Sequence, residues 1–164
     1  MGAVKSGSAM MSKGVFQDLC CLRIRKTIAD RDGKTEYLKE SGVGLKVTWK
    51  NGISWGLIIR CCRILHESLQ RTFAQKDQIN LAFVCSELGF RSAVAYAIVT
   101  SDEPSKLQVI IIELADLISM ADSGGVPWLR YSQKHGIILC FNSSKGYMDK
   151  IKSNPHVCYA AYTL

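Results

Sequence analysis

The sequence predicts a single α+β domain with a largely antiparallel β-sheet, two or three short helices and a flexible N-terminal arm. Three observations support this fold class: apolar residues alternate in several short runs, an Asn-Gly pair separates two of these runs, and helical and strand-like segments follow in mixed order. The chain has 164 residues, 48% of them hydrophobic, and only 3 prolines, so it can bury a core. We expect an arm over residues 1–14 and a single α+β domain over residues 15–164.

The first segments combine two kinds of pattern. Residues 1–14, MGAVKSGSAMMSKG, have no apolar periodicity and are rich in Gly and Ser, which is typical of a flexible arm. Residues 15–27 begin with helical spacing and then alternate Leu22 and Ile24 with Arg23 and Arg25, which predicts a short helix passing into a strand. Residues 30–33, Asp-Arg-Asp-Gly, predict the turn that ends it.

A β-hairpin is the clearest local signal. Residues 45–50 and 53–59 are β-rich, and Asn51-Gly52 between them suits the two positive-φ positions of a type I′ turn. Lys46 and Lys50 are then expected to share one face of the sheet, opposite to Trp49.

The middle of the chain predicts a helix and three buried strands. Residues 64–78 have helical apolar spacing with a Glu67–Arg71 pair, and residues 81–85, 93–99 and 107–112 are continuous apolar runs. The turn-like residues 101–106 are expected to join the last two strands antiparallel.

The last third predicts short elements. Residues 114–120 form a helical turn before the Gly-Gly-Val-Pro break at 124–127, and residues 128–131 and 136–141 form a second hairpin. A short amphipathic helix over 146–152 and a strand over 156–164 complete the chain.

The positive charge is concentrated in the first third of the chain. Residues 1–63 hold 12 Lys and Arg against 5 Asp and Glu, a net charge of +7, whereas residues 64–164 hold 9 of each. Such asymmetry indicates a polyanionic partner, either an anionic membrane surface or nucleic acid. A basic face without any partner is the alternative. The candidate polyanion-binding residues are Lys5, Lys13, Arg23, Arg25, Lys26, Lys46, Lys50, Arg60 and Arg63.

The first six residues, Met-Gly-Ala-Val-Lys-Ser, satisfy the N-myristoylation pattern M-G-x-x-x-[ST], which makes Gly2 a candidate lipidation site. One myristoyl chain binds membranes with a constant of only about 10⁴ M⁻¹, so a basic cluster or a palmitate on Cys20 or Cys21 would be the second anchor. Buried packing thiols are the alternative for this cysteine pair.

RNA is the competing polyanion. Trp49 and Trp55 lie among the basic residues of the first third, as in a basic sheet surface with stacking aromatics, while core positions in the hairpin are the alternative. No RRM, KH or zinc-knuckle signature is present, so binding would be without sequence specificity.

The sequence carries no recognisable catalytic or cofactor motif, so we expect a protein that is not an enzyme and has no cofactor. Tyr131, His135 and Cys140 would be the first candidates for a hidden active site. A metal site assembled from Cys62-x3-His66 and His156-x-Cys158 is not expected, because nothing brings the pairs together. The 7 cysteines and the lack of a secretory signal predict reduced thiols in the cytoplasm.

Together, the MGAVKS start, the basic residues up to position 63 and the compact body resemble the organisation of small viral matrix proteins. The resemblance implies a structural protein that binds the inner face of a membrane and assembles with itself or with a ribonucleoprotein. No PPxY late-assembly motif is present, so a budding role is not implied. A cytosolic RNA-binding protein is the second hypothesis.

Overall fold

The computed structural model describes residues 11–38, 44–63 and 70–164 and confirms the α+β class with mostly antiparallel sheets. Its strands are β1 (Lys34–Tyr37), β2 (Leu45–Thr48), β3 (Ser54–Arg63), β4 (Gln70–Phe73), β5 (Arg91–Thr100), β6 (Glu103–Glu113), β7 (Leu129–Ser132), β8 (Gly136–Cys140) and β9 (Cys158–Thr163). The helices are α2 (Lys13–Ala29), α3 (Gln75–Leu88), α4 (Leu114–Ser123) and α5 (Tyr147–Lys152), with a 3-10 turn η1 at Ser143–Lys145.

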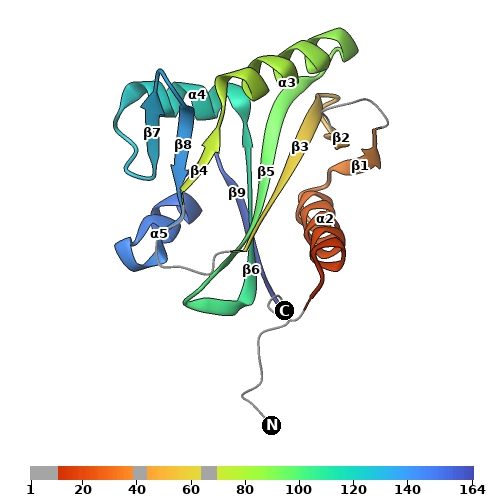
Figure 1. The fold of residues 1–164 in the computed structure, drawn as a ribbon. Helices are drawn as coiled ribbons and strands as arrows, with labels where there is room; N and C mark the ends of the chain where they lie inside the picture. The colour runs from red at the N-terminus through yellow and green to blue at the C-terminus, as the bar shows by residue number, and fades with distance from the viewer. Residues whose placement is uncertain (1–10, 39–43, 64–69) are drawn as a thin grey trace.

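A central six-stranded sheet in the order β1-β2-β3-β5-β6-β9 organises the molecule. All its neighbours pair antiparallel except β3 and β5, which are parallel because the chain between them crosses through β4 and α3. The second sheet has the order β4-β8-β7. Figure 1 shows α2 alone on one side of the large sheet, with the small sheet, α4 and α5 on the other.

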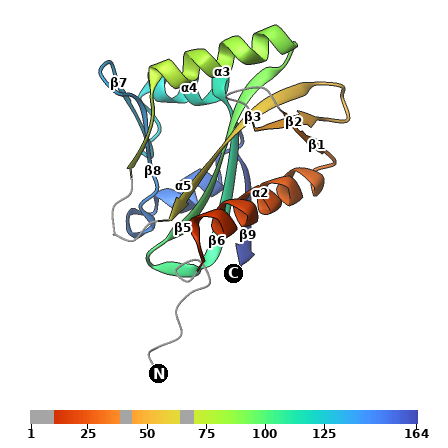
Figure 2. The same ribbon diagram turned by 45° about the vertical axis from the view of Figure 1, so that its right-hand side comes forward.

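Helix α2 covers one face of the large sheet through residues spaced four apart. Phe16, Cys20, Ile24 and Ile28 are buried, and they pack against small alanines of β5 and branched residues of β6. Figure 2 shows the helix lying across these strands. Ser12 begins the helix by accepting a hydrogen bond from the Val15 N–H at 3.2 Å through its hydroxyl.

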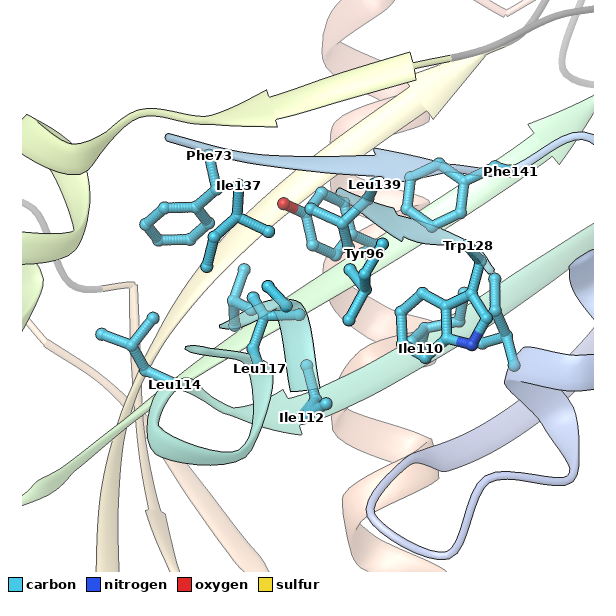
Figure 3. Packing of buried hydrophobic residues seen from close by; sticks show 14 of the residues in the cluster. Phe73, Tyr96, Ile110, Ile112, Leu114, Leu117, Trp128, Ile137, Leu139 and Phe141 are labelled. Carbon is cyan, nitrogen blue, oxygen red and sulfur yellow. The ribbon is translucent and has the colours of Figure 1, made fainter. Parts of the chain in front are cut away.

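The small sheet and helices α3, α4 and α5 cover the opposite face. Tyr96 of β5 packs against Phe141 with the ring centroids 5.3 Å apart and the ring planes tilted by 56°, and Trp128 lies beside Ile110 in the same cluster (Figure 3). Side chains of β5 therefore alternate between two cores, so that this strand is buried on both faces.

The predicted helix-to-strand segment at 15–27 is wrong, because residues 13–29 form one helix. The alternation of Arg23 and Arg25 with Leu22 and Ile24 misled the prediction. In the helix Ile24 is buried while Leu22 is 58% exposed, and the arginines lie at the edges of the buried face. The helix also includes Lys13 and Gly14, which were assigned to the arm; residues 1–10 lie outside the described residues.

The hairpin of β2 and β3 is confirmed, but its type I′ turn is not. The Trp49 carbonyl accepts from Gly52 N–H, the Trp49 N–H donates to Ile53, and among the turn residues only Gly52 has a positive φ, +84°. This is a three-residue loop that ends in a left-handed glycine. Lys50 consequently lies in the turn and does not share a strand face with Lys46.

The predictions for residues 64–85 are wrong where the structure describes them. Residues 70–73 form strand β4, not the end of a helix, and the predicted strand at 81–85 belongs to α3. Leu81 and Cys85 are its two buried residues, one turn apart, whereas Phe83 is 65% exposed. Residues 64–69, including Glu67 of the expected Glu67–Arg71 pair, lie outside the described residues.

The remaining predictions from residue 93 onward are confirmed. They cover the antiparallel pair β5–β6, helix α4, the hairpin β7–β8, helix α5 and strand β9. The connection between β5 and β6 is shorter than expected, because β6 already begins at Glu103. Strands β1 and β4 were not predicted, since each has only four residues and is largely exposed.

A substitution at Gly136 tests how closely β8 packs against β4. Its φ is +95°, and a Cβ atom would lie 2.5 Å from the Phe73 carbonyl oxygen. We expect Gly136→Ala to lower the free energy of unfolding by about 3 kcal/mol or more, measured by urea denaturation. Gly52→Ala is the control, since at φ +84° it meets no atom within 4 Å, and it should cost only about 1–2 kcal/mol. Equal losses would contradict this packing.

Tyr96 tests the cost of a buried polar group. Its hydroxyl is shielded from solvent without a hydrogen-bond partner among the described residues, and burial raises its pKa. Tyr96→Phe removes this unsatisfied group and keeps the ring, so the free energy of unfolding should stay equal or rise by about 1 kcal/mol. A clear loss in thermal or urea unfolding would reveal a partner for the hydroxyl.

Candidate nucleic-acid interface

An open pocket lies at the end of the large sheet, just beyond the last turn of α2. Its volume is about 450 Å³. Its walls come from the turn after α2, the β2–β3 hairpin and the adjoining ends of β5 and β6. The lining residues are Arg31, Trp49, Lys50, Asn51, Ile53, Trp55, Arg91 and Glu113.

The hairpin places the two tryptophans of the pocket together. Trp49 follows Leu45 and Val47 on the face of β2 toward α2, and Val47 is directly opposite Trp55 of β3. The indole rings meet edge to face, with centroids 5.0 Å apart and an interplanar angle of 73°. Both rings are only partly buried, so the pocket keeps accessible aromatic surface.

Gly33 in the turn after α2 makes room for this arrangement. A Cβ atom at Gly33 would lie 2.9 Å from the Trp49 ring and 2.5 Å from Ile28, so only glycine lets the turn approach them this closely. The position of Trp49 therefore depends on the turn that also carries Arg31.

Arg31 is held by backbone oxygens. Its Nη1 donates to the Thr27 carbonyl at 3.1 Å and its Nη2 to the Tyr159 carbonyl at 2.6 Å. No carboxylate lies within ion-pair distance of it in the part of the chain that the structure describes. Neutral groups therefore hold the guanidinium in position, and no acid neutralises its charge.

Two further cations of the pocket have acidic neighbours. Lys50 lies 3.4 Å from Asp32, and both side chains are largely exposed; Arg91 lies 3.8 Å from Glu113. An exposed pair such as Lys50–Asp32 contributes little to stability, so Lys50 can turn to another anion at low cost. Three cations against Glu113 leave the lining with a net charge of +2, which falls to +1 when Asp32 is included.

Cys158 lies close enough to Arg31 for their charges to interact. Burial raises the pKa of the Cys158 thiol, although the Arg31 charge opposes this change. The group is therefore a neutral thiol near pH 7 and adds no negative charge beside the guanidinium.

The structure separates the predicted lipidation residues. Cys20 is fully buried on the face of α2 toward the large sheet. Cys21 is partly exposed, and its sulfur lies 3.4 Å from the Tyr37 hydroxyl. Cys20 is thus the packing thiol of the alternative interpretation and cannot reach an acyl donor in this fold. Gly2 and Lys5 lie outside the described residues.

The candidate polyanion-binding cations do not share one face. Lys13, Arg23, Arg25 and Lys26 are on α2, and the Arg63 guanidinium lies 4.6 Å from the Phe16 ring of that helix. Lys46 lies over Phe90 at 5.4 Å and Arg60 over Phe73 at 4.8 Å, both on the opposite side of the large sheet. Alternation along β2 and β3 causes this split, since neighbouring residues of a strand point to opposite faces.

Several of these cations are already engaged. Carboxylates lie within 4 Å of four of them: Lys26–Asp30 at 3.4 Å, Lys46–Glu36 at 3.6 Å, Lys50–Asp32 at 3.4 Å and Arg60–Asp77 at 3.2 Å. Arg25 donates to Thr35 and stacks 4.9 Å over the Tyr37 ring, and Arg23 lies 5.0 Å over Tyr162. The net charge of the first third is therefore distributed around the molecule.

The candidate catalytic side chains do not assemble either. Tyr131 is 54% exposed on β7, His135 lies in the following turn, and Cys140 is buried at the end of β8. No group of three or more metal-ligating side chains occurs within residues 11–38, 44–63 and 70–164; His66 lies outside these ranges. His156 instead lies 3.7 Å from Asp116.

Arg31 and Arg91 were missed by the sequence analysis. Arg31 was assigned only to a turn, and Arg91 stands before a buried strand, so no local pattern linked them to the tryptophans. The pairing of β3 with β5, which sets Trp55 opposite Arg91, brings them together. The one usable signal was the presence of Trp49 and Trp55 beside an Asn-Gly turn.

Comparison with models of known protein families finds no match, and comparison with curated proteins finds none either. Over the residues that the structure describes, none of the helices is both long and apolar enough to span a bilayer.

Proposed function

We propose that this protein is a non-enzymatic RNA-binding protein that holds single-stranded RNA, without sequence specificity, at the pocket of Trp49 and Trp55. One observation supports the proposal above the others: two partly exposed indoles and three cations from three separate segments converge on one open pocket. Proteins that bind single strands combine aromatic platforms with positive grooves in this way.

The chemistry of the pocket suits an unpaired nucleotide. A base can stack on an indole face, the Arg91 guanidinium can donate hydrogen bonds to a phosphate, and the Arg31 charge, which its carbonyl partners leave unneutralised, attracts the same anion. Lys50 is exposed in the hairpin turn, and its long, flexible side chain can reach the adjoining phosphate. Because stacking accepts every base, we expect little discrimination among sequences.

A pocket favours RNA over a flat lipid surface as the partner of these cations. A membrane is contacted by one face of a protein, and the candidate cations lie on both sides of the large sheet. An RNA strand needs only the local pocket and can bend around it.

The RNA proposal predicts that particular substitutions weaken binding of a labelled oligouridylate of about 12 nucleotides, measured by fluorescence anisotropy. Trp55→Leu should weaken binding by about 1–3 kcal/mol, because it removes a stacking surface. Lys50→Ala should weaken binding of all sequences alike and lower the slope of log affinity against log salt by about 0.7.

Two variants far from the pocket are the controls. Lys134→Ala changes an exposed lysine in the β7–β8 turn, and Tyr131→Ala removes an exposed aromatic ring of β7. Both should bind as the unchanged protein does. Equal losses in test and control variants, or an affinity that does not depend on salt, would contradict the proposal.

The MGAVKS motif supports a second candidate function, that of a matrix-like, self-assembling lipoprotein on the cytoplasmic face of a membrane. Here the acyl chain on Gly2 supplies the first anchor, and basic residues of α2 such as Lys13 and Lys26 supply the second.

This second function predicts a myristoyl adduct in the intact mass of the protein made in eukaryotic cells. The Gly2→Ala variant should lack the adduct and leave the vesicle fraction in a flotation assay, because basic residues alone bind weakly. Ala3→Gly keeps the acceptor and should float as before. Unchanged flotation of Gly2→Ala would contradict an anchoring role for an acyl chain on Gly2.

A further inference from the structure

A groove with a largely apolar lining lies between α3, α4 and the β7–β8 hairpin. Its volume is about 460 Å³, and it shares no lining residue with the pocket of Trp49 and Trp55. Ile79 and Ala82 of α3 line one side, and Leu114 and Ile118 of α4 line the other. We call this site the α3–α4 groove.

The exposed large hydrophobic side chains of the described residues gather on two surfaces. They are Val15, Leu22, Tyr37, Ile79, Phe83, Ile118 and Tyr131. Three of them line the α3–α4 groove, Phe83 lies one helical turn after Ile79, and two lie on α2. Since exposed apolar patches mark contact sites, the molecule presents two of them, one on α2 and one at the groove.

The outer face of α2 has the side-chain spacing that fits a groove between helices. Val15 and Leu22 are seven positions apart, so they lie on the same side of the helix, about 10 Å apart along its axis. This side faces away from the buried Cys20 and Ile24. Amphipathic helices bind in apolar grooves through side chains spaced in this way.

The two surfaces carry opposite charge. Helix α2 holds four Lys and Arg against one Asp, a net charge of +3, whereas α3 and α4 together hold one Lys against four Asp and Glu, a net charge of −3. Asp122 lies in the groove lining, is exposed and has no ion-pair partner within the described ranges. The groove therefore suits a basic helix with apolar side chains, and α2 is such a helix.

The α2 surface and the groove of one molecule lie on different sides of the large sheet. The buried side of α2 packs in one core, and α3 and α4 pack in the core on the opposite face (Figures 1 and 2). Since the sheet separates them, the outer face of α2 cannot enter the groove of its own chain, so the matching helix must come from another molecule.

We propose that the outer face of α2 in one copy of this protein docks in the α3–α4 groove of a second copy. Because the two surfaces differ, each bound pair keeps one free helix face and one free groove, and the assembly grows head to tail. A two-fold contact of groove with groove is disfavoured, since it would place the carboxylates of two copies against each other.

This contact identifies the surfaces for the self-assembly named in the second candidate function, and its biological role rests on that function. The contact itself needs neither the acyl chain on Gly2 nor RNA. Its test therefore uses the full chain made in bacteria, which do not attach the acyl chain, after removal of nucleic acid. A negative result then concerns the contact alone, while the RNA and flotation assays decide the two proposed functions.

Sedimentation velocity at protein concentrations from about 5 to 200 µM measures the assembly, because one helix face in one groove is a small interface. We expect the unsubstituted chain to grow beyond two copies as its concentration rises. Raising the salt from about 50 to 500 mM should weaken association, since opposite charges meet in the contact. A chain that stays monomeric at the highest concentration would overturn the proposal.

Two exposed positions provide one variant for each surface. Leu22→Glu places a charge on the outer face of α2, and Ile79→Glu places one in the groove. Each should weaken association by about tenfold or more, because the added charge loses its water in the contact. Ala161→Glu, at an exposed position of β9 that belongs to neither surface, should assemble as the unsubstituted chain does.

Mixing the two variants distinguishes this contact from every symmetric one. Leu22→Glu keeps an intact groove, and Ile79→Glu keeps an intact helix face, so an equimolar mixture should form pairs that do not grow further. Circular dichroism checks that each variant folds. The proposal is wrong if the folded variants form no pairs when mixed, or if either variant alone assembles as well as Ala161→Glu.

Discussion

The burial of β5 on both faces is the constraint on which the rest of the structure depends. Its residues alternate between small side chains toward α2, such as Ala95 and Ala97, and larger ones toward the small sheet, such as Tyr96 and Ile98. A strand without a solvent face needs a cover on each side. Helix α2 is one cover, and the β4-β8-β7 sheet with its helices is the other.

This arrangement also determines where the pocket forms. Because α2 covers only part of its face, the ends of β2 and β3 extend beyond the helix and leave Trp49 and Trp55 partly exposed. The turn that ends α2 brings Arg31 over the same ends, and the hydrogen bond from its guanidinium to the Tyr159 carbonyl ties it to β9. The same helix buries Cys20 and Ile28, so the packing of α2 also fixes the turn from which Arg31 extends.

Local patterns were sufficient where an element's burial agrees with its intrinsic preference. The β2–β3 hairpin, the β5–β6 pair and α4 were predicted because turn residues and apolar runs coincide there. In α3 the local pattern and the burial disagree. Residues 81–85 are a continuous apolar run, which is typical of a strand, but only the first and last of them are buried. Strand β4 is too short to carry a period of its own, and its pairing with β8 holds it in the sheet.

The sequence by itself determined the α+β class, the hairpin with its two tryptophans and the excess of positive charge in the first third, since each follows from residues adjacent in the chain. Only the tertiary structure decided that Lys46 and Arg60 face away from α2, and that Arg31 and Arg91 join Trp55. The reason is geometric: which face a strand residue occupies, and which distant segment lies beside it, depends on sheet pairing and helix packing across the whole chain.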